Sequence, residues 1–210
     1  MLMNYLLFKR IFDIVFALLF FVLLSPIYLI TAVVIYLGDF HNPFYKHLRV
    51  GKNRKQFDFY KFRSMVANAD DILFKDPEFL KKMRSGTNKV IDDPRITKFG
   101  RFIRKYSIDE FPQMLNVIKG DMSVIGPRAL RPDEFAGYES LSSENKQKLD
   151  LLATVKPGIS GYWQVNGRSN VDFERRMELE CYYARNISFK LDFEIILKTP
   201  MTMIKGEGAY

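Results

Sequence analysis

The hydrophobic pattern of the chain begins with one long apolar segment. Residues 14–38 contain no charged side chain and no histidine over 25 positions. As a helix this stretch would be about 37 Å long at 1.5 Å per residue, which exceeds the hydrocarbon core of a bilayer, roughly 30 Å. A signal peptide has an apolar region of only about 7–15 residues, followed by a small-residue cleavage site, and this run is longer and has no such site. The segment is predicted to enter a membrane.

Two features distinguish this segment from a simple spanning helix. Ser25 and Pro26 lie in its middle; the proline lacks an N–H and its ring crowds the Val22 carbonyl, so a straight helix is broken or kinked there. Basic residues flank both ends, whereas a spanning helix carries them mainly on its cytoplasmic side. They are Lys9, Arg10, Lys46, Arg49, Lys52, Arg54 and Lys55. Two interpretations follow from this segment alone: a re-entrant helix–break–helix with both ends in the cytoplasm, or a kinked span.

The remaining pattern predicts an α+β fold that is mainly helical. Residues 56–65 alternate and are aromatic-rich, which predicts a strand. Helices are expected at 66–84 (interrupted at Asp76–Pro77), 96–106, 111–119 (stopped by Gly120), 172–185 and 191–205 (interrupted by Pro200). Loops are expected at 85–94, 121–131 and 155–168, the last with a short strand. We predict an N-terminal membrane segment over 1–38 and one compact domain over 39–210.

The helix expected at 96–106 is amphipathic. Its apolar residues recur at helical spacing, and its other face is basic with Lys98, Arg101, Arg104 and Lys105. Such a helix suits either a membrane interface or a core-facing position with a solvated basic face. The neighbouring apolar segment favours the membrane interface.

Composition narrows the class of protein. The 210 residues hold 32 Lys and Arg against 24 Asp and Glu, a net charge of +8. With 48% apolar and 27% charged residues, a disordered or collagen-like chain is excluded. The single cysteine, Cys181, rules out an intrachain disulfide and a Cys-rich zinc site, and two histidines are too few for a His-based metal centre. The positive charge and 19 Phe with 11 Tyr indicate a polyanionic partner.

One acidic pair stands out as candidate chemistry. No Gly-x-Gly-x-x-Gly, P-loop, Gly-x-Ser-x-Gly or His-Glu-x-x-His motif is present. Asp109 and Glu110 are instead accompanied by arginines along the chain: Arg101, Arg104, Arg128, Arg131 and Arg168. Arginines hold phosphate oxygens in forked hydrogen bonds. A carboxylate can bind Mg²⁺ beside substrate phosphates or attack phosphorus itself. This set of residues favours phosphoryl transfer.

Each of these features also has an ordinary structural explanation. Ser107 and Glu110 have the spacing of a capping box, in which Glu110 would accept from the Ser107 N–H and leave Asp109 free at a helix N-terminus. Lys61 and Arg63 fit a solvated strand face, Gly126–Arg128 fits a common turn, and Cys181 fits an inert core thiol.

Taken together, six segments resemble one known family, the small monotopic phosphoglycosyl transferases or bacterial sugar transferases. They are 9–13 (KRIFD), 25–26 (SP), 61–65 (KFRSM), 107–113 (SIDEFPQ), 120–128 (GDMSVIGPR) and 156–168 (KPGISGYWQVNGR). Their order and number make the resemblance specific over nearly the whole chain. One departure is Glu180, before Cys181-Tyr182-Tyr183, where the family usually has Asp.

The resemblance implies an enzyme that transfers a phosphosugar from a UDP-sugar to undecaprenyl phosphate and so begins bacterial glycan assembly. It implies Asp109 as nucleophile and Mg²⁺ ligand, Glu110 as the second catalytic carboxylate, and Mg²⁺ as cofactor. Substrate phosphates and nucleotide would be bound by Arg104, Arg128 and Arg168, with Lys61 a weaker candidate. Ser25 and Pro26 would form the break of a re-entrant membrane helix. The enzyme would lie on the cytoplasmic face of the bacterial inner membrane, in contact with lipid.

The similarity to exopolysaccharide and capsule members favours galactose or glucose over an N-acetylated sugar. The resemblance is compatible with a homodimer, and it does not imply a nucleic-acid partner. The alternative reading of the charge and the apolar anchor is a membrane-anchored nucleic-acid-binding or adaptor protein without catalysis.

Overall fold

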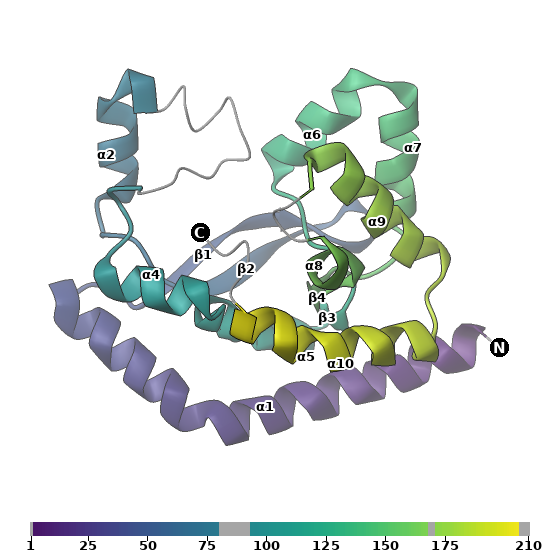
Figure 1. Cartoon of the computed structure of the whole chain (residues 1–210), viewed down its shortest axis with the longest axis horizontal. Helices are drawn as coiled ribbons and strands as arrows, with labels where there is room; N and C mark the ends of the chain where they lie inside the picture. The colour runs from purple at the N-terminus through teal and green to yellow at the C-terminus, as the bar shows by residue number, and fades with distance from the viewer. Residues whose placement is uncertain (1, 80–92, 168–170, 206–210) are drawn as a thin grey trace.

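The computed structural model describes residues 2–79, 93–167 and 171–205. A long N-terminal helix packs against the other elements of the protein. Figure 1 shows α1 along one side of the molecule, with α5 and α10 lying over its first half and the other elements stacked above them. The helices used below are α1 (Leu2–Asp39), α2 (Ala69–Lys75), α4 (Lys98–Lys105), α5 (Met114–Lys119), α6 (Pro132–Leu141), α7 (Ser143–Leu152), α8 (Tyr162–Asn166), α9 (Phe173–Arg185) and α10 (Phe189–Lys205), with the 3-10 helices η1 (Lys52–Arg54) and η2 (Ile108–Gln113). The expected mainly helical α+β class is confirmed.

Two small sheets complete the architecture. Strands β1 (Phe44–Val50) and β2 (Gln56–Phe62) form an antiparallel hairpin in which Val50 faces Gln56. Strands β3 (Ser123–Ile125) and β4 (Gly158–Ser160) pair in parallel. The strand expected at 56–65 is confirmed as β2, and the short strand expected within 155–168 is β4. Sequence reasoning missed β1, whose side chains are mostly exposed, and β3, which lies in the expected loop 121–131.

Most helix predictions agree with the structure, with shifted ends. The segment 96–106 forms α4, whose first turn is capped by the Thr97 side chain accepting from the Gly100 N–H at 2.8 Å. The segment 111–119 forms the end of η2 and α5, and Gly120 ends α5 with φ 93. Pro200 does not interrupt α10, which continues to Lys205, because a proline removes one helical hydrogen bond without obliging the helix to end. Most of the loop expected at 85–94 lies outside the described residues.

The apolar segment is one helix with a bend rather than two helices with a break between them. α1 runs through Pro26, and Figure 1 shows its two arms meeting at an obtuse angle near the middle of the helix. The Ser25 hydroxyl donates to the Val22 carbonyl at 2.9 Å, as expected beside a proline kink. α1 is long and apolar enough to cross a membrane, with a mean hydropathy of 2.7 in its most apolar stretch, only 11% of which is buried. Val22 and Leu23 are 72% and 73% exposed, so the bend presents apolar side chains outward.

Polar residues on both arms attach α1 to the rest of the protein. On the first arm, the Lys9 ammonium lies 2.6 Å from Asp192, and Asp13 accepts from the Val124 N–H at 2.9 Å. Arg10 donates to the last carbonyls of α5, at Val117 (2.6 Å) and Ile118 (2.9 Å). Lys9 and Arg10 therefore do more than flank an apolar segment: they bind the domain packed on it.

The second arm contacts the same domain. The Tyr28 hydroxyl donates to the Phe111 carbonyl, and Asp39 at the end of α1 pairs with Arg63 just after β2. Tyr28 also packs against the rings of Phe62 and Phe111, with centroids 5.6 and 6.0 Å away. Both arms of the bent helix are thus held by one domain.

A buried asparagine joins α5 to β2. The Asn116 side chain, 0% exposed, accepts from the Tyr60 N–H at 3.2 Å and donates to the Asp58 carbonyl at 2.6 Å. It satisfies two backbone groups at the free edge of β2, which would otherwise be buried without partners. η2, which directly precedes α5, is thereby held beside β2.

Gly100 sets the distance between α4 and the end of β2. A Cβ at this position would lie 1.9 Å from the Ser64 carbonyl oxygen and 2.8 Å from the Thr97 hydroxyl. The Thr97 N–H also donates to that same carbonyl at 3.1 Å. The absence of a side chain at Gly100 therefore allows α4, which carries Arg104, to approach the strand that carries Lys61.

We expect Gly100→Ala to destabilise the protein strongly, because the Ser64 carbonyl is backbone and cannot rotate away. The cost of such overpacking is about 3 kcal/mol or more, which lowers Tm by about 6 °C or more for a domain of this size. Thermal unfolding of detergent-purified protein, followed by circular dichroism, measures the change.

Gly137→Ala in α6 is the matched control, because nothing lies within 4 Å of its added Cβ. Alanine is the better helix former by about 1 kcal/mol, so the Tm should stay the same or rise. Equal Tm values for the two variants would contradict the close approach at Gly100.

Candidate active site

The carboxylate pair lies against the end of β2. Lys61 on β2 reaches both carboxylates of η2: its Nζ is 2.7 Å from Glu110 Oε1 and 3.3 Å from Asp109 Oδ2. The lysine side chain is only 18% exposed, so it does not form a solvated strand face. Lys61, predicted only as a weaker candidate, is thus the cation that pairs with both Asp109 and Glu110.

The capping-box interpretation of Ser107 and Glu110 is wrong. Ser107 adopts a left-handed conformation with φ 57 and its side chain caps nothing, whereas a capping residue has extended backbone. Its N–H donates to the Arg104 carbonyl at 3.1 Å, so the group that Glu110 would have bound is already satisfied. The Glu110 side chain is therefore available for contacts with distant residues.

Glu110 forms a forked ion pair with Arg128. The Nη2 and Nη1 atoms of Arg128 lie 2.8 Å from Oε1 and 3.3 Å from Oε2, so Glu110 meets two cations, Arg128 and Lys61. Burial by itself raises the pKa of Glu110, but the charges of Arg128 and Lys61 outweigh burial and hold this pKa well below its usual range. Glu110 is an ionised carboxylate with both oxygens engaged.

Asp109 has a different environment. Its side chain is buried, and burial raises the pKa of Asp109 while the charges of Lys61 and Arg104 oppose that shift. Arg104 acts on it by charge, without donating a hydrogen bond. Only Oδ2 meets Lys61, and within the described part of the chain Oδ1 accepts no hydrogen bond. Asp109 is thus the carboxylate with an oxygen left to react or to bind a cation.

The donor set fits Mg²⁺ only when substrate phosphates share in binding it. The described residues contain no group of three Asp, Glu, His or Cys side chains that could hold a metal. Mg²⁺ is commonly held by one or two carboxylates, waters and substrate phosphates, and the unengaged Oδ1 of Asp109 matches that arrangement. Asp109 is the residue that would hold it.

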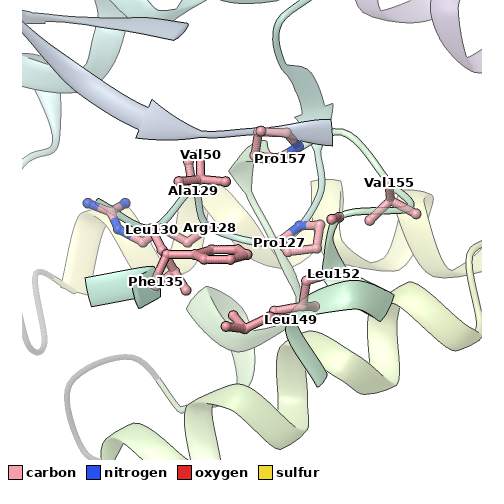
Figure 2. A pocket seen from close by; sticks show the side chains of 12 residues that line it. Val50, Pro127, Arg128, Ala129, Leu130, Phe135, Leu149, Leu152, Val155 and Pro157 are labelled. Carbon is pink, nitrogen blue, oxygen red and sulfur yellow. The ribbon is translucent and has the colours of Figure 1, made fainter. Parts of the chain in front are cut away.

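Arg128 projects from a loop, residues 126–131, that several elements hold. Behind this loop lies a small cavity lined mainly by apolar side chains, including Pro127, Leu130, Phe135, Leu149 and Pro157. Figure 2 shows the Arg128 guanidinium directed away from these apolar side chains. It forms hydrogen bonds with Glu110. The expected Gly-Pro turn is therefore a rigid support for a site residue.

The other arginines of the sequence analysis have different positions. Arg101 on α4 is exposed, and Arg131 pairs with Asp133 and Glu134 at 3.1 and 3.3 Å rather than with the acidic pair. Arg168 lies outside the described residues, so its expected role stays a prediction.

Sequence reasoning missed Arg49 of β1, whose side chain is only 14% exposed. Its Nη1 donates to the Ala129 carbonyl at 3.0 Å and lies 3.4 Å from Glu134, and its Nε donates to His47 Nε2 at 2.8 Å. Burial lowers the pKa of Arg49 to about 10 and that of His47 to about 3, helped in both cases by neighbouring arginines. His47 is therefore neutral and can accept. The alternation of 44–50 (FYKHLRV) was the available signal, since it places His47 and Arg49 on one face.

Comparison with known proteins identifies the family of the chain. The family model described as bacterial sugar transferase matches residues 4–206. The chain is 36% identical to the exopolysaccharide production protein ExoY of Sinorhizobium fredii over 96% of the chain and 88% of that protein. It is 40% identical to the undecaprenyl-phosphate galactose phosphotransferase of Salmonella typhimurium and 38% identical to the UDP-galactose-lipid carrier transferase of Erwinia amylovora, each over 96% of the chain.

The chain spans 41% of the length of each of these last two proteins. The match with the family model covers all three segments that meet at the site, 61–65, 107–113 and 120–128. The chain belongs to the bacterial sugar transferase family.

Proposed function

We propose that this protein transfers a phosphosugar from a UDP-sugar to undecaprenyl phosphate, with UMP as the other product, and that it initiates exopolysaccharide or capsule synthesis. The observation that carries the proposal is the unequal carboxylate pair: Lys61 and Arg128 bind Glu110, whereas Asp109 keeps one oxygen without a hydrogen-bond partner among the described residues. Relatives named for undecaprenyl phosphate, galactose and a UDP-sugar support the substrate classes. Relatives named for galactose and for glucose support one of these as the donor sugar.

Asp109 is the nucleophile in this proposal. An Asp109 oxygen forms a bond to the sugar-bearing phosphorus of the donor, the bond from that phosphorus to the bridging oxygen breaks, and UMP leaves with that oxygen. An oxygen of undecaprenyl phosphate then attacks the same phosphorus, and the bond to Asp109 breaks to restore the carboxylate. No proton is gained or lost by the enzyme in either step. A raised pKa makes Asp109 a better nucleophile once it is ionised.

The cations around the pair stabilise the donor. Arg128 and Lys61 lie within hydrogen-bond distance of Glu110, and Arg104 acts on Asp109 by its charge, so phosphate oxygens placed beside Asp109 would meet up to three positive charges. Mg²⁺, held by Asp109 together with the donor diphosphate, would neutralise charge that develops on the leaving phosphate. Glu110 fixes the orientation of Lys61 and Arg128 throughout.

The site would lie at the cytoplasmic surface of the membrane. Both arms of α1 are attached to one domain, at Lys9–Asp192 and at Asp39–Arg63, which supports a re-entrant helix over a span. Tyr28 binds the carbonyl of Phe111, next to Glu110, so the second arm contacts the 3-10 helix that holds the carboxylates. The basic helix α4 adds half-exposed Phe102. Family membership weighs against the alternative of a non-catalytic nucleic-acid-binding or adaptor protein.

We expect Asp109→Asn to abolish turnover while the protein folds and inserts normally, because an amide is a poor nucleophile. With donor alone, the wild type should carry a phosphosugar mass on the tryptic peptide 106–119, and Asp109→Asn should not. Mass spectrometry and UMP release with undecaprenyl phosphate and Mg²⁺ are the measurements. The exposed Asp71→Asn on α2 is the control. An unlabelled wild-type peptide, with kinetics that require both substrates bound together, would replace the covalent route by direct attack of the lipid phosphate.

We expect Arg128→Lys to lose activity about as severely as Arg128→Ala, by at least about 10²-fold, the scale of losing one preorganised donor. Lysine lacks the planar fork that Arg128 uses on Glu110. Initial rates of UMP release measure the loss, and Arg175→Lys, on the exposed side of α9, is the matched control. Full activity in Arg128→Lys would show that the reaction needs only the positive charge at this position and not the planar fork of arginine.

We expect cysteines placed at Asn4 and at Lys46, in a variant without Cys181, to be protected together from a membrane-impermeant reagent added to intact cells. Asn4 lies in the first turn of α1 and Lys46 on β1, beyond the other end of that helix, and both are exposed. Both should react after the cells are opened. Labelling of position 4 alone in intact cells would establish a spanning helix and end the re-entrant interpretation.

A further inference from the structure

Glu180 is a buried carboxylate that the proposed reaction does not use. It lies on α9 and is 1% exposed. Burial raises its pKa, and the charge of Arg176, 3.9 Å away, opposes that shift. Burying an acid at this cost is seldom favoured for stability alone, since apolar residues of similar volume often serve better. The contacts of Glu180 therefore indicate that its carboxylate has a role other than filling space in the core.

The Glu180 carboxylate binds the backbone of Arg128. Glu180 Oε1 accepts from the Arg128 N–H at 2.9 Å. Within the described residues, this is the bond by which α9 reaches the main chain of the loop. A carboxylate placed on this N–H fixes where the Arg128 side chain begins.

The rest of the loop is held as firmly, residue by residue. The Gly126 N–H donates to Ser160, and the Pro127 carbonyl accepts from Gly158, at 2.9 and 2.8 Å. The Ala129 carbonyl accepts from Arg49, and the Leu130 carbonyl from the Val50 N–H at 2.9 Å. Arg128 is the middle residue of this series, and its partner is the one carboxylate in it.

Arg176 is the countercharge of Glu180 and is itself held in place. Its guanidinium lies 4.6 Å from the centre of the Trp163 ring and 5.6 Å from that of Phe173. The Arg176 Nε lies 3.9 Å from Glu180 Oε1, the oxygen that accepts the Arg128 N–H, which is beyond hydrogen-bond distance. Arg176 therefore acts on Glu180 by its charge, and its contacts with the two aromatic rings hold it there.

We propose that Glu180 is a positioning residue that acts through Arg128: it holds the Arg128 main chain so that the guanidinium stays on Glu110 and meets the donor diphosphate. The proposal rests on the proposed function only in naming a diphosphate as the ligand of Arg128. It predicts that the effect of changing Glu180 depends on Arg128 being present, which a purely structural role does not.

A double-mutant cycle tests this dependence. The proteins are the wild type, Glu180→Gln, Arg128→Ala and the double variant, with Glu178→Gln as control, because Glu178 lies on the same helix but pairs with exposed Arg175. Three quantities are measured for each protein: the Kd for UDP in the presence of Mg²⁺, kcat/KM for UMP release, and the KM for undecaprenyl phosphate. Gln keeps the volume of Glu, and thermal unfolding measures whether each variant is folded.

We expect Glu180→Gln to weaken UDP binding about tenfold, equivalent to about 1.4 kcal/mol, and to lower kcat/KM similarly, with the KM for undecaprenyl phosphate unchanged. In the Arg128→Ala background the same change should have no further effect, because residues that act as a unit are not additive. Equal losses in both backgrounds, or no loss in either, would overturn the proposal. Coupled UDP binding in a protein that never turns over undecaprenyl phosphate would support the role of Glu180 while rejecting the proposed function.

Discussion

The site depends on one buried contact, the carboxylate of Glu110 between Lys61 and Arg128. These three residues come from β2, η2 and the loop after β3, which are far apart in the sequence. Removing one partner from a buried ionic cluster leaves an uncompensated charge, which generally costs about 3–5 kcal/mol. The three segments are thereby kept together, and both cations are kept beside Asp109. The same contact makes the two neighbouring acids chemically different, since Glu110 is engaged on both oxygens and Asp109 on one.

The membrane helix and the site are parts of one structure. Arg10 binds the last carbonyls of α5, and α5 directly follows the 3-10 helix that holds the carboxylates. On the other arm, Tyr28 binds the carbonyl that follows Glu110. A straight helix would carry Tyr28 away from the domain that Arg10 binds, so the bend at Pro26 lets both contacts exist. In a bilayer, the outward apolar side chains of the bend would fix the depth at which Asp109 lies.

Local sequence patterns predicted the helices and strands of the fold better than they predicted the contacts between them. The helices at 96–106 and 172–185 and the strand at 56–65 were predictable because their periodicity and caps are local. Strand β1 was not, because polar and apolar residues alternate only over its last four positions, and its apolar Phe44, Tyr45 and Leu48 are about half-exposed. The spacing of Ser107 and Glu110 gave a wrong answer for a related reason: a capping box assumes extended backbone at Ser107, but tertiary packing places this residue at φ 57.

The sequence by itself determined the apolar segment with its Ser25–Pro26 kink, the acidic pair, the arginines and the family, because each depends on residue identity and order along the chain. Only the tertiary structure decided which cations meet which acid. Lys61 and Arg128 reach Glu110 across 49 and 18 positions of sequence, and Glu180 reaches the Arg128 backbone across 52. Such pairings follow from how buried segments pack and satisfy their charges and backbone groups together, and no local spacing encodes them.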